Sequence, residues 1–128
     1  MSHIPGDLKY SPTHTWTEIL DDGLIKVGIT DYAQKELGDI VYVELPEEEN
    51  SYAAGQECAV VESVKSASDI YCPVSGEIVE VNHVLDETPE KINSDPYGSG
   101  WLFILRPDDA DALDELIDAE EYGELIEE

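Results

Sequence analysis

The 128-residue sequence predicts a mostly β fold, a flattened sandwich with short inserted helices and a helical C-terminus. Three observations favour this fold class. Short apolar runs rich in Val, Ile and Tyr alternate with turn signals built from Gly, Pro and Asp. Apolar residues at helical spacing are confined to short stretches and to the end of the chain. Residues 38–44 and 76–82 share the pattern Gly-acid-Ile-Val-x-Val, which indicates two similar strand sets related by a pseudo-two-fold axis.

The first part of the chain predicts a hairpin followed by a helix. Residues 15–20 and 24–29 have strand composition, and Gly23 ends the Asp-Asp-Gly turn that joins them. A short helix follows, with Thr30 expected as its N-cap and Gly38 as the residue that stops it.

Apolar runs that end at turn residues predict the remaining strands, over residues 39–45, 58–61, 70–74, 77–81 and 101–105. Residues 88–92 predict a helical turn that has a proline at its first helical position. Near the C-terminus, Asp118 and Glu121 resemble a capping box, which divides the helical region into two short helices.

The length predicts one domain over residues 1–128, with its core over about 15–106 and a helical segment over about 108–128. Six basic residues against 31 acidic ones give a net charge of −25, which disfavours nucleic acid as a partner. No run approaches the roughly 18 apolar residues of a membrane span, and the first residues lack a secretory or transit pattern. We therefore expect a cytoplasmic protein, monomeric and without a membrane partner.

The acidic excess extends over the whole chain. Eleven acids lie in residues 108–128, so residues 1–107 still carry 20 acids and six bases. Two interpretations stay open: a surface that steers partner proteins, or an adaptation to high salt, in which self-repulsion is screened. Salt adaptation is favoured, because a docking patch alone does not need acidic clusters at 21–22, 47–49 and the C-terminus together.

Cys58 and Cys72 are too few for a disulfide framework, and they lie seven residues before and after Lys65. If a hairpin is centred near this lysine, the two thiols lie near each other on neighbouring strands. In a cytoplasm we expect them to be reduced, buried and inert. The three histidines show no ligand spacing, so the sequence assigns no metal.

Lys65 is the candidate functional residue. It lies at the expected tip of a hairpin, in a chain with only five lysines. Its immediate neighbours are short side chains, which leave the amine accessible to a modifying enzyme: Ser63, Val64, Ser66 and Ala67. Glu62 and Asp69 flank this segment with charge that is able to orient a ligase or a client. A rigid turn that presents one amine is a place to attach a group covalently.

Two other interpretations of Lys65 stay open. In the simplest one, it is an ordinary solvated charge on a purely structural acidic β domain. In the other, it is a catalytic lysine that forms a Schiff base, which requires desolvation or a nearby cation. The polar and acidic neighbours of Lys65 offer the opposite environment, so the sequence disfavours this enzymatic reading.

Residues 62–69 and 73–82 resemble the lipoyl-attachment motif of the glycine cleavage system H protein family. They read Glu-Ser-Val-Lys-Ser-Ala-Ser-Asp and Pro-Val-Ser-Gly-Glu-Ile-Val-Glu-Val-Asn. The similarity extends over nearly the whole chain. Further matching segments are residues 8–10, 13–14, 16, 28–33, 37–39, 93–98 and 100–102. Together they are far more specific than any single motif.

The resemblance implies a barrel-sandwich hybrid in which Lys65 carries lipoate in amide linkage. It implies a carrier and not an enzyme, a protein that shuttles the aminomethyl group of glycine on its lipoyl arm. The implied partners are the pyridoxal-phosphate-dependent glycine decarboxylase, the tetrahydrofolate-dependent aminomethyltransferase and the flavin-dependent dihydrolipoamide dehydrogenase. A lipoate ligase or lipoyl transferase is implied for the loading of Lys65.

The family holds its loaded arm in a surface cleft, and by position Thr13, Thr15 and Asp69 resemble residues that line this cleft. Thr15 departs from the family, which often has a glutamate just before the tryptophan. The departure removes a carboxylate from an ionic contact with the loaded amine, whereas Asp69 can still serve. Trp16 and Trp101 are assigned to the core.

Three related carriers remain as alternatives. Biotin carriers use the same hairpin, but they typically place methionine on both sides of the lysine, where this chain has Val64 and Ser66. Lipoyl domains of 2-oxoacid dehydrogenases are normally shorter, and they lack the Trp101 segment and the helical end. An H-like protein that relays lipoate to other enzymes is the third alternative, and the sequence leaves it open.

Overall fold

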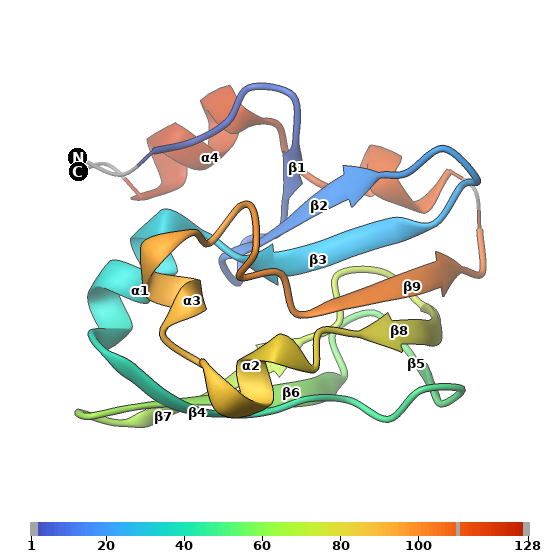
Figure 1. Ribbon diagram of the computed structural model, residues 1–128. Helices are drawn as coiled ribbons and strands as arrows, with labels where there is room; N and C mark the ends of the chain where they lie inside the picture. The colour runs from blue at the N-terminus through green and yellow to red at the C-terminus, as the bar shows by residue number, and fades with distance from the viewer. Residues whose placement is uncertain (1–2, 110, 127–128) are drawn as a thin grey trace.

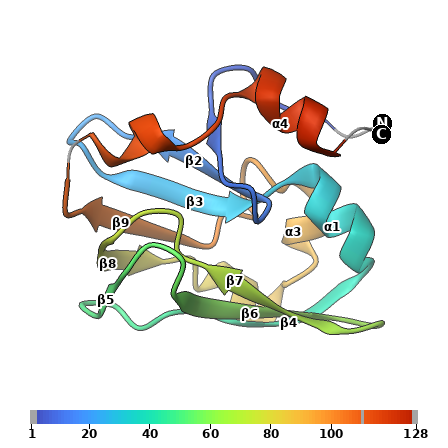
Figure 2. The same cartoon turned by 180° about the vertical axis from the view of Figure 1, so that it is seen from behind.

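The computed structural model describes residues 3–109 and 111–126, which form two antiparallel sheets with short helices at their ends (Figures 1 and 2). The larger sheet has the strand order β1-β2-β3-β9-β8-β5, and the smaller has the order β4-β6-β7. The strands are β1 (Lys9–Tyr10), β2 (Thr15–Ile19), β3 (Ile25–Ile29), β4 (Ile40–Glu44), β5 (Ser51–Tyr52), β6 (Glu57–Ser63), β7 (Ala67–Tyr71), β8 (Gly76–Val81) and β9 (Phe103–Pro107). The helices are α1 (Asp31–Leu37), α2 (Val84–Glu87), α3 (Lys91–Ser94), the 3₁₀ helix η1 (Ala112–Glu115) and α4 (Ala119–Ile126). The predicted mostly β class is confirmed.

Local sequence signals account for the β2–β3 hairpin and for α1. Gly23 has φ +81°, the left-handed conformation that the turn requires, and β2 and β3 pair along their full length. In α1, the Thr30 side chain accepts a hydrogen bond from the backbone N–H of Ala33 at 3.2 Å. Gly38 ends the helix with φ +86°, and its N–H bonds to the carbonyl of Gln34. Both predicted helix caps are confirmed.

The two strands that carry the internal repeat, β4 and β8, each contain a β-bulge. The register of β4 against β6 shifts between Ile40 and Tyr42, and that of β8 against β9 shifts between Ile78 and Glu80. The extra residue therefore falls at the same place of the shared pattern in both strands, and the two strands lie in different sheets. This agrees with two similar strand sets.

A hydrophobic core lies between the two sheets, and a second cluster lies beneath α4. The second cluster contains Tyr10, Trp16 and Tyr122, each fully buried, and the Tyr10 and Tyr122 rings stack with centroids 4.8 Å apart. A Cβ on Gly28 would lie 2.7 Å from the Trp16 ring, so this position of β3 admits only glycine. Trp16 is thus a core residue as predicted, whereas Trp101 is half-buried at the margin of the same cluster.

Several boundaries differ from the predicted ones. The last strand begins at Phe103 rather than 101, and the helical turn expected over 88–92 is displaced to α3. The short elements α2 and β5 have no counterpart among the predictions. At the C-terminal end, η1 and α4 are the two short helices that were predicted, and Asp118 Oδ1 accepts the Glu121 N–H at 2.9 Å. Within the described part of the chain, no helix has the length and apolar character needed to cross a membrane.

Candidate functional site

Lys65 lies at the tip of the hairpin formed by β6 and β7, and the turn around it is held by Ser63. The backbone N–H of Ser63 donates to the carbonyl of Ser66 at 2.8 Å. The Ser63 hydroxyl oxygen accepts hydrogen bonds from the N–H groups of Lys65 and Ser66, both at 3.1 Å. The N–H of Val64 donates to the carbonyl of Asp39 at 3.0 Å, which ties the turn to the start of β4. The side chain of Ser63, two residues before the lysine, therefore fixes the backbone that presents the amine.

The Lys65 side chain lies against the C-terminal end of α1. Its Nζ donates a hydrogen bond to the backbone carbonyl of Glu36 at 2.9 Å. The carbonyls of the last helical turn have no partner within the helix, so a cation is favoured there. A Cβ on Gly38 would lie 3.2 Å from Lys65 Cε, so a glycine leaves room for the stem of the lysine. Figures 1 and 2 both show the hairpin tip beside the end of α1.

A cleft of about 260 Å³ opens beside the amine. It is lined by Thr13, His14, Ile29, Tyr32, Ala33, Glu36, Leu37, Ser68, Asp69 and Ile70. Glu36, whose carbonyl binds the Lys65 amine, is one of these residues, so the lysine side chain ends at the rim of the cleft.

The cleft combines an apolar lining with two carboxylates. Ile29, Ala33, Leu37 and Ile70 supply the apolar part, and Glu36 and Asp69 supply the acids. Such a lining suits a flexible aliphatic chain that ends in a cation, because the chain removes apolar surface from water and the cation meets a negative charge.

The structure brings Thr13 and Asp69 to this cleft, and it places Thr15 elsewhere. Thr15 is fully buried in β2, and its hydroxyl lies 2.6 Å from the hydroxyl of Ser11. It is absent from the residues that line the cleft, and we leave it out of the site. The physical reason is that both faces of β2 are covered at this point, because the consecutive residues Thr15, Trp16 and Thr17 are all buried.

His14 was not predicted as a site residue, although it lines the cleft. Its Nδ1 lies 2.8 Å from the hydroxyl of Tyr122, a residue of α4. Burial lowers the pKa of His14 below its ordinary value, against a smaller opposing effect of the negative charge of Glu36. His14 therefore contributes a neutral ring to the cleft at neutral pH.

The residues of α1 that line the cleft were also missed by the sequence predictions. They are Tyr32, Ala33, Glu36 and Leu37, at positions i, i+1, i+4 and i+5, which share one face of a helix. Their spacing in the sequence would therefore have placed these four residues on one face of the predicted helix. It would not have shown that this face lies opposite β7, because that contact depends on the tertiary fold.

Cys58 and Cys72 are both buried, as predicted, and they are free. The neighbouring Cys72 thiol and burial raise the pKa of the Cys58 thiol. Each thiol also donates to a backbone carbonyl, that of Ile70 at 3.5 Å and that of Val74 at 3.1 Å. These thiols lie in the core, away from the lysine, and have no part in the site.

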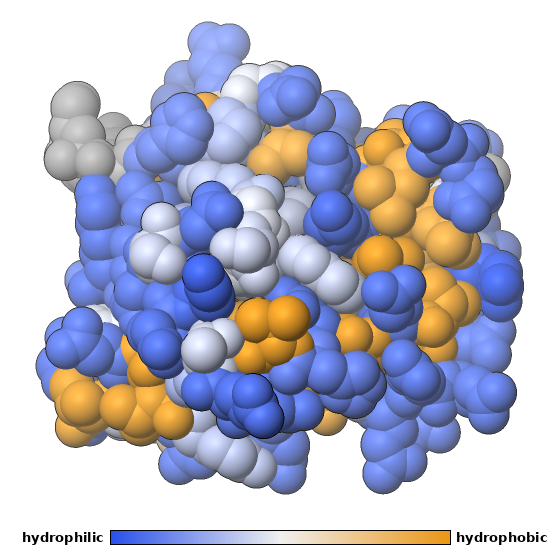
Figure 3. Space-filling model, viewed as in Figure 1, coloured by the Kyte–Doolittle hydropathy of each residue, from blue (hydrophilic) through white to orange (hydrophobic). Residues whose placement is uncertain are grey.

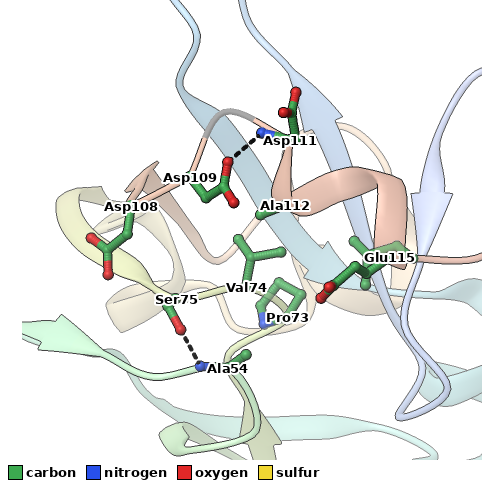
Figure 4. Close-up of a pocket in the computed structure, with 10 residues that line it drawn as sticks. Ala54, Pro73, Val74, Ser75, Asp108, Asp109, Asp111, Ala112 and Glu115 are labelled. Atoms are coloured by element: carbon green, nitrogen blue, oxygen red, sulfur yellow. Dashed lines mark hydrogen bonds between the residues drawn. The ribbon is translucent and has the colours of Figure 1, made fainter.

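A larger hollow, of about 390 Å³, lies elsewhere on the molecule and shares no residue with the cleft. Figure 4 shows its acidic rim, formed by Asp108, Asp109, Asp111 and Glu115. The N–H of Asp111 donates to Asp109 Oδ1 at 2.9 Å, so part of the acidic charge is used by the local turn. No group of three or more metal-ligating side chains is found among residues 3–109 and 111–126. We assign this hollow no chemistry.

The face of the molecule in Figure 3 is mostly hydrophilic, with a few hydrophobic areas. One of these areas lies at the lower left, where Figure 1 shows β4 and the end of the β6–β7 hairpin. Val41 and Val64 are 54% and 67% exposed, which accounts for apolar surface next to the lysine. Apolar surface therefore lies beside the hairpin tip on a face that is otherwise mostly hydrophilic.

An exposed amine on a rigid hairpin, with a cleft at its side, is the arrangement of a carrier protein, a domain that presents a covalently attached group. Comparison with known proteins identifies the family. The family model for the glycine cleavage H-protein matches residues 8–128. The chain therefore belongs to the glycine cleavage H-protein family, whose members are the lipoyl-bearing shuttles of the glycine cleavage system and not enzymes.

Individual relatives agree over the full length. The glycine cleavage system H protein of Alkalilimnicola ehrlichii is 54% identical over 126 residues, which are 98% of this chain and 97% of that protein. That of Shewanella denitrificans is 56% identical over 128 residues, 100% of this chain and 99% of that protein. The crystal structure of a glycine cleavage system H protein from Mycobacterium marinum superposes with a TM-score of 0.90 at 43% identity, covering 98% of this chain and 100% of that one. The resemblance seen in the sequence is confirmed.

Proposed function

We propose that Lys65 is the lipoyl attachment site of this shuttle protein, and that the loaded arm lies in the cleft beside α1. The observation that carries the proposal is the 2.9 Å hydrogen bond from Lys65 Nζ to the carbonyl of Glu36, a residue that lines the cleft. An arm that starts at this nitrogen starts at the rim of the cleft. When bound, lipoate supplies a disulfide that accepts the aminomethyl group and leaves a free thiol.

The residues of the chain fit this group in three respects. The turn at Ser63 holds the attachment point rigid, which limits the volume that the arm samples and raises its effective concentration at a docked enzyme. The apolar lining formed by Ile29, Leu37 and Ile70 suits the aliphatic part of the arm. Asp69 and Glu36 suit the cationic end of a loaded arm.

Membership of the glycine cleavage system implies partner enzymes. We propose as partners the glycine decarboxylase, the aminomethyltransferase and the dihydrolipoamide dehydrogenase, with a lipoate ligase or lipoyl transferase for loading. The net charge of −25 favours partner surfaces that are basic, and it disfavours self-association. A monomeric state and a cytoplasmic location stay predictions.

The test replaces Lys65 with Arg, which keeps the positive charge and removes the acylatable amine. Lys91→Arg is the matched control, because Lys91 is also exposed and lies in α3, outside the hairpin and the cleft. We expect the parent protein and K91R, each isolated from the native host, to carry a lipoyl group by intact-mass measurement. K65R should show the unmodified mass, and it should not support exchange of glycine with bicarbonate.

Three outcomes count against the proposal. Lipoylation of K65R would move the attachment site elsewhere, and a biotinyl adduct on Lys65 would assign the chain to another carrier class. Full lipoylation without glycine–bicarbonate exchange, in the presence of the decarboxylase, would favour a protein that relays lipoate to other enzymes.

A further inference from the structure

The hydroxyl of Tyr122 connects the C-terminal helix to two walls of the cleft. It lies 2.8 Å from His14 Nδ1 and 2.7 Å from Thr30 Oγ1. His14 lines the cleft directly, and Thr30 caps α1, which forms the wall opposite β7. Tyr122 is fully buried, and its ring stacks on Tyr10 with an interplanar angle of 9°, so the position of the hydroxyl is fixed by packing. A residue far along the sequence thus contacts the site through one polar atom.

The chemistry of the three groups favours one direction of proton donation. Thr30 Oγ1 already accepts the N–H of Ala33, so its own proton is available for the oxygen of Tyr122. A phenol that accepts a hydrogen bond becomes a stronger donor. The unprotonated nitrogen of an imidazole is a better base than a phenol oxygen, so the Tyr122 proton is directed to Nδ1 of His14. In a neutral ring, the remaining proton then lies on Nε2.

Within residues 3–109 and 111–126 His14 takes no other side-chain hydrogen bond, and it lines the cleft, so we assign Nε2 to the cleft side of the ring. The titratable groups around the ring are Tyr32 and Glu36 of α1, Asp69 of β7 and Tyr122 of α4. A protonated His14 would offset the charge of Glu36 and Asp69, the two carboxylates of the cleft. It would also repel any cation that enters.

We propose that Tyr122 is a positioning residue of the cleft, which holds His14 as the neutral Nε2–H tautomer so that the cleft keeps its negative charge for an ammonium group. The ammonium group is that of the loaded arm, and in this respect the proposal rests on the proposed function. The tautomer of His14 is a property of the unmodified chain and does not depend on it.

The first experiment is NMR of the full-length, unmodified protein labelled with ¹⁵N. The ¹⁵N chemical shifts of the His14 ring distinguish a protonated Nε2 from a protonated Nδ1. We expect the Nε2–H pattern at neutral pH. An Nδ1–H pattern in the parent protein would overturn the proposal, and this measurement requires no substitution, so it remains decisive if a variant does not fold.

The second experiment replaces Tyr122 with Phe, which keeps the stacked ring and removes the hydroxyl. Loss of one hydrogen bond to the neutral form should raise the NMR-measured pKa of His14 by roughly 0.5 to 1 pH unit. Tyr42→Phe is the matched control, because Tyr42 is 52% exposed and lies on β4, outside the cleft. An unchanged tautomer and titration of His14 in Y122F would also overturn the proposal.

A readout on the loaded carrier completes the test. The aminomethyl group is released slowly from a carrier kept apart from its enzymes, and the rate is followed by ammonia formation. We expect release to accelerate as His14 becomes protonated, and the pH midpoint of this acceleration to move upward in Y122F by the same amount as the pKa. A release rate with the same pH profile in the parent and Y122F would exclude a role for Tyr122 in the cleft. Absence of lipoylation would instead refute the proposed function and leave the tautomer result standing.

Discussion

Replacement of Gly38 by Ala tests how the end of α1 accommodates Lys65. Gly38 has φ +86° and ψ −157°, a region that is essentially restricted to glycine. Its carbonyl accepts a hydrogen bond from Asn93 Nδ2 at 2.9 Å, so the backbone cannot rotate freely to relieve a side chain. A non-glycine residue in such a conformation costs about 1–3 kcal/mol, and we expect G38A to lose this amount of unfolding free energy. For a chain of this size the loss lowers Tm by roughly 3–6 °C per kcal/mol.

The same substitution also brings a Cβ to 3.2 Å from Lys65 Cε. This contact should contribute little, because Cε belongs to the end of a flexible side chain that can move by a few tenths of an ångström. A double-mutant cycle with Lys65→Ala separates the two effects. We expect G38A to cost the same in the parent and in the K65A background, within about 0.5 kcal/mol.

The assay is urea denaturation, with an unchanged slope as the sign that only stability has changed. Gly55→Ala is the control, because Gly55 also has a positive φ, of +84°, but no atom lies within 4 Å of its Cβ position. Rescue of most of the G38A loss by K65A would show that crowding of the lysine dominates. A loss below about 0.5 kcal/mol would refute the argument from backbone strain.

Two further predictions concern charge. With 31 acidic and six basic residues, the protein should gain thermal stability as salt is raised from low millimolar to about 1 M. The reason is screening of the repulsion between acids, because the Debye length falls to about 3 Å at 1 M. A Tm that does not change with salt would contradict salt adaptation. The pKa of His14 is lowered by burial, so between the ordinary value of about 6.5 and the lower folded value the unfolded chain binds a proton that the native state does not. The unfolding free energy of the parent should therefore fall relative to that of His14→Gln as pH falls through this window, and the difference between the two should be constant above about pH 7.5. A difference in unfolding free energy that stays constant from pH 8 to 5 would show that the pKa of His14 is the same in the folded and unfolded states.

The elements that could be predicted from the sequence are those whose signals are local. The β2–β3 hairpin has its glycine at the turn, and α1 has Thr30 and Gly38 at its two ends. The position of Lys65 at a hairpin tip follows from short side chains between two apolar runs. In each case the residues that determine the structure lie close together in the sequence.

The features that could not be predicted depend on contacts between distant segments. The helix α2 has only four residues and no side-chain N-cap, so it leaves no local signal. Thr13 and Thr15 are separated by one residue, yet only Thr13 reaches the cleft, because the buried position of Thr15 is decided by the strands and helix that cover β2. The contribution of Tyr122 to the cleft spans 108 positions of the chain from His14.

β4 and β8 each have a bulge at the same place of the repeated sequence pattern, and this bulge explains an arrangement of buried residues that a regular strand does not allow. In a regular strand, residues three apart face opposite sides, yet Ile40 and Val43 are both buried, and so are Ile78 and Val81. The extra residue between them shifts the alternation of side chains by one position, so both apolar side chains point inward. The six-residue pattern therefore predicts a strand with a bulge at this position. A search of other sandwich sequences for two copies of it, 38 residues apart as in this chain, should find molecules that share both irregularities before any of their structures is known.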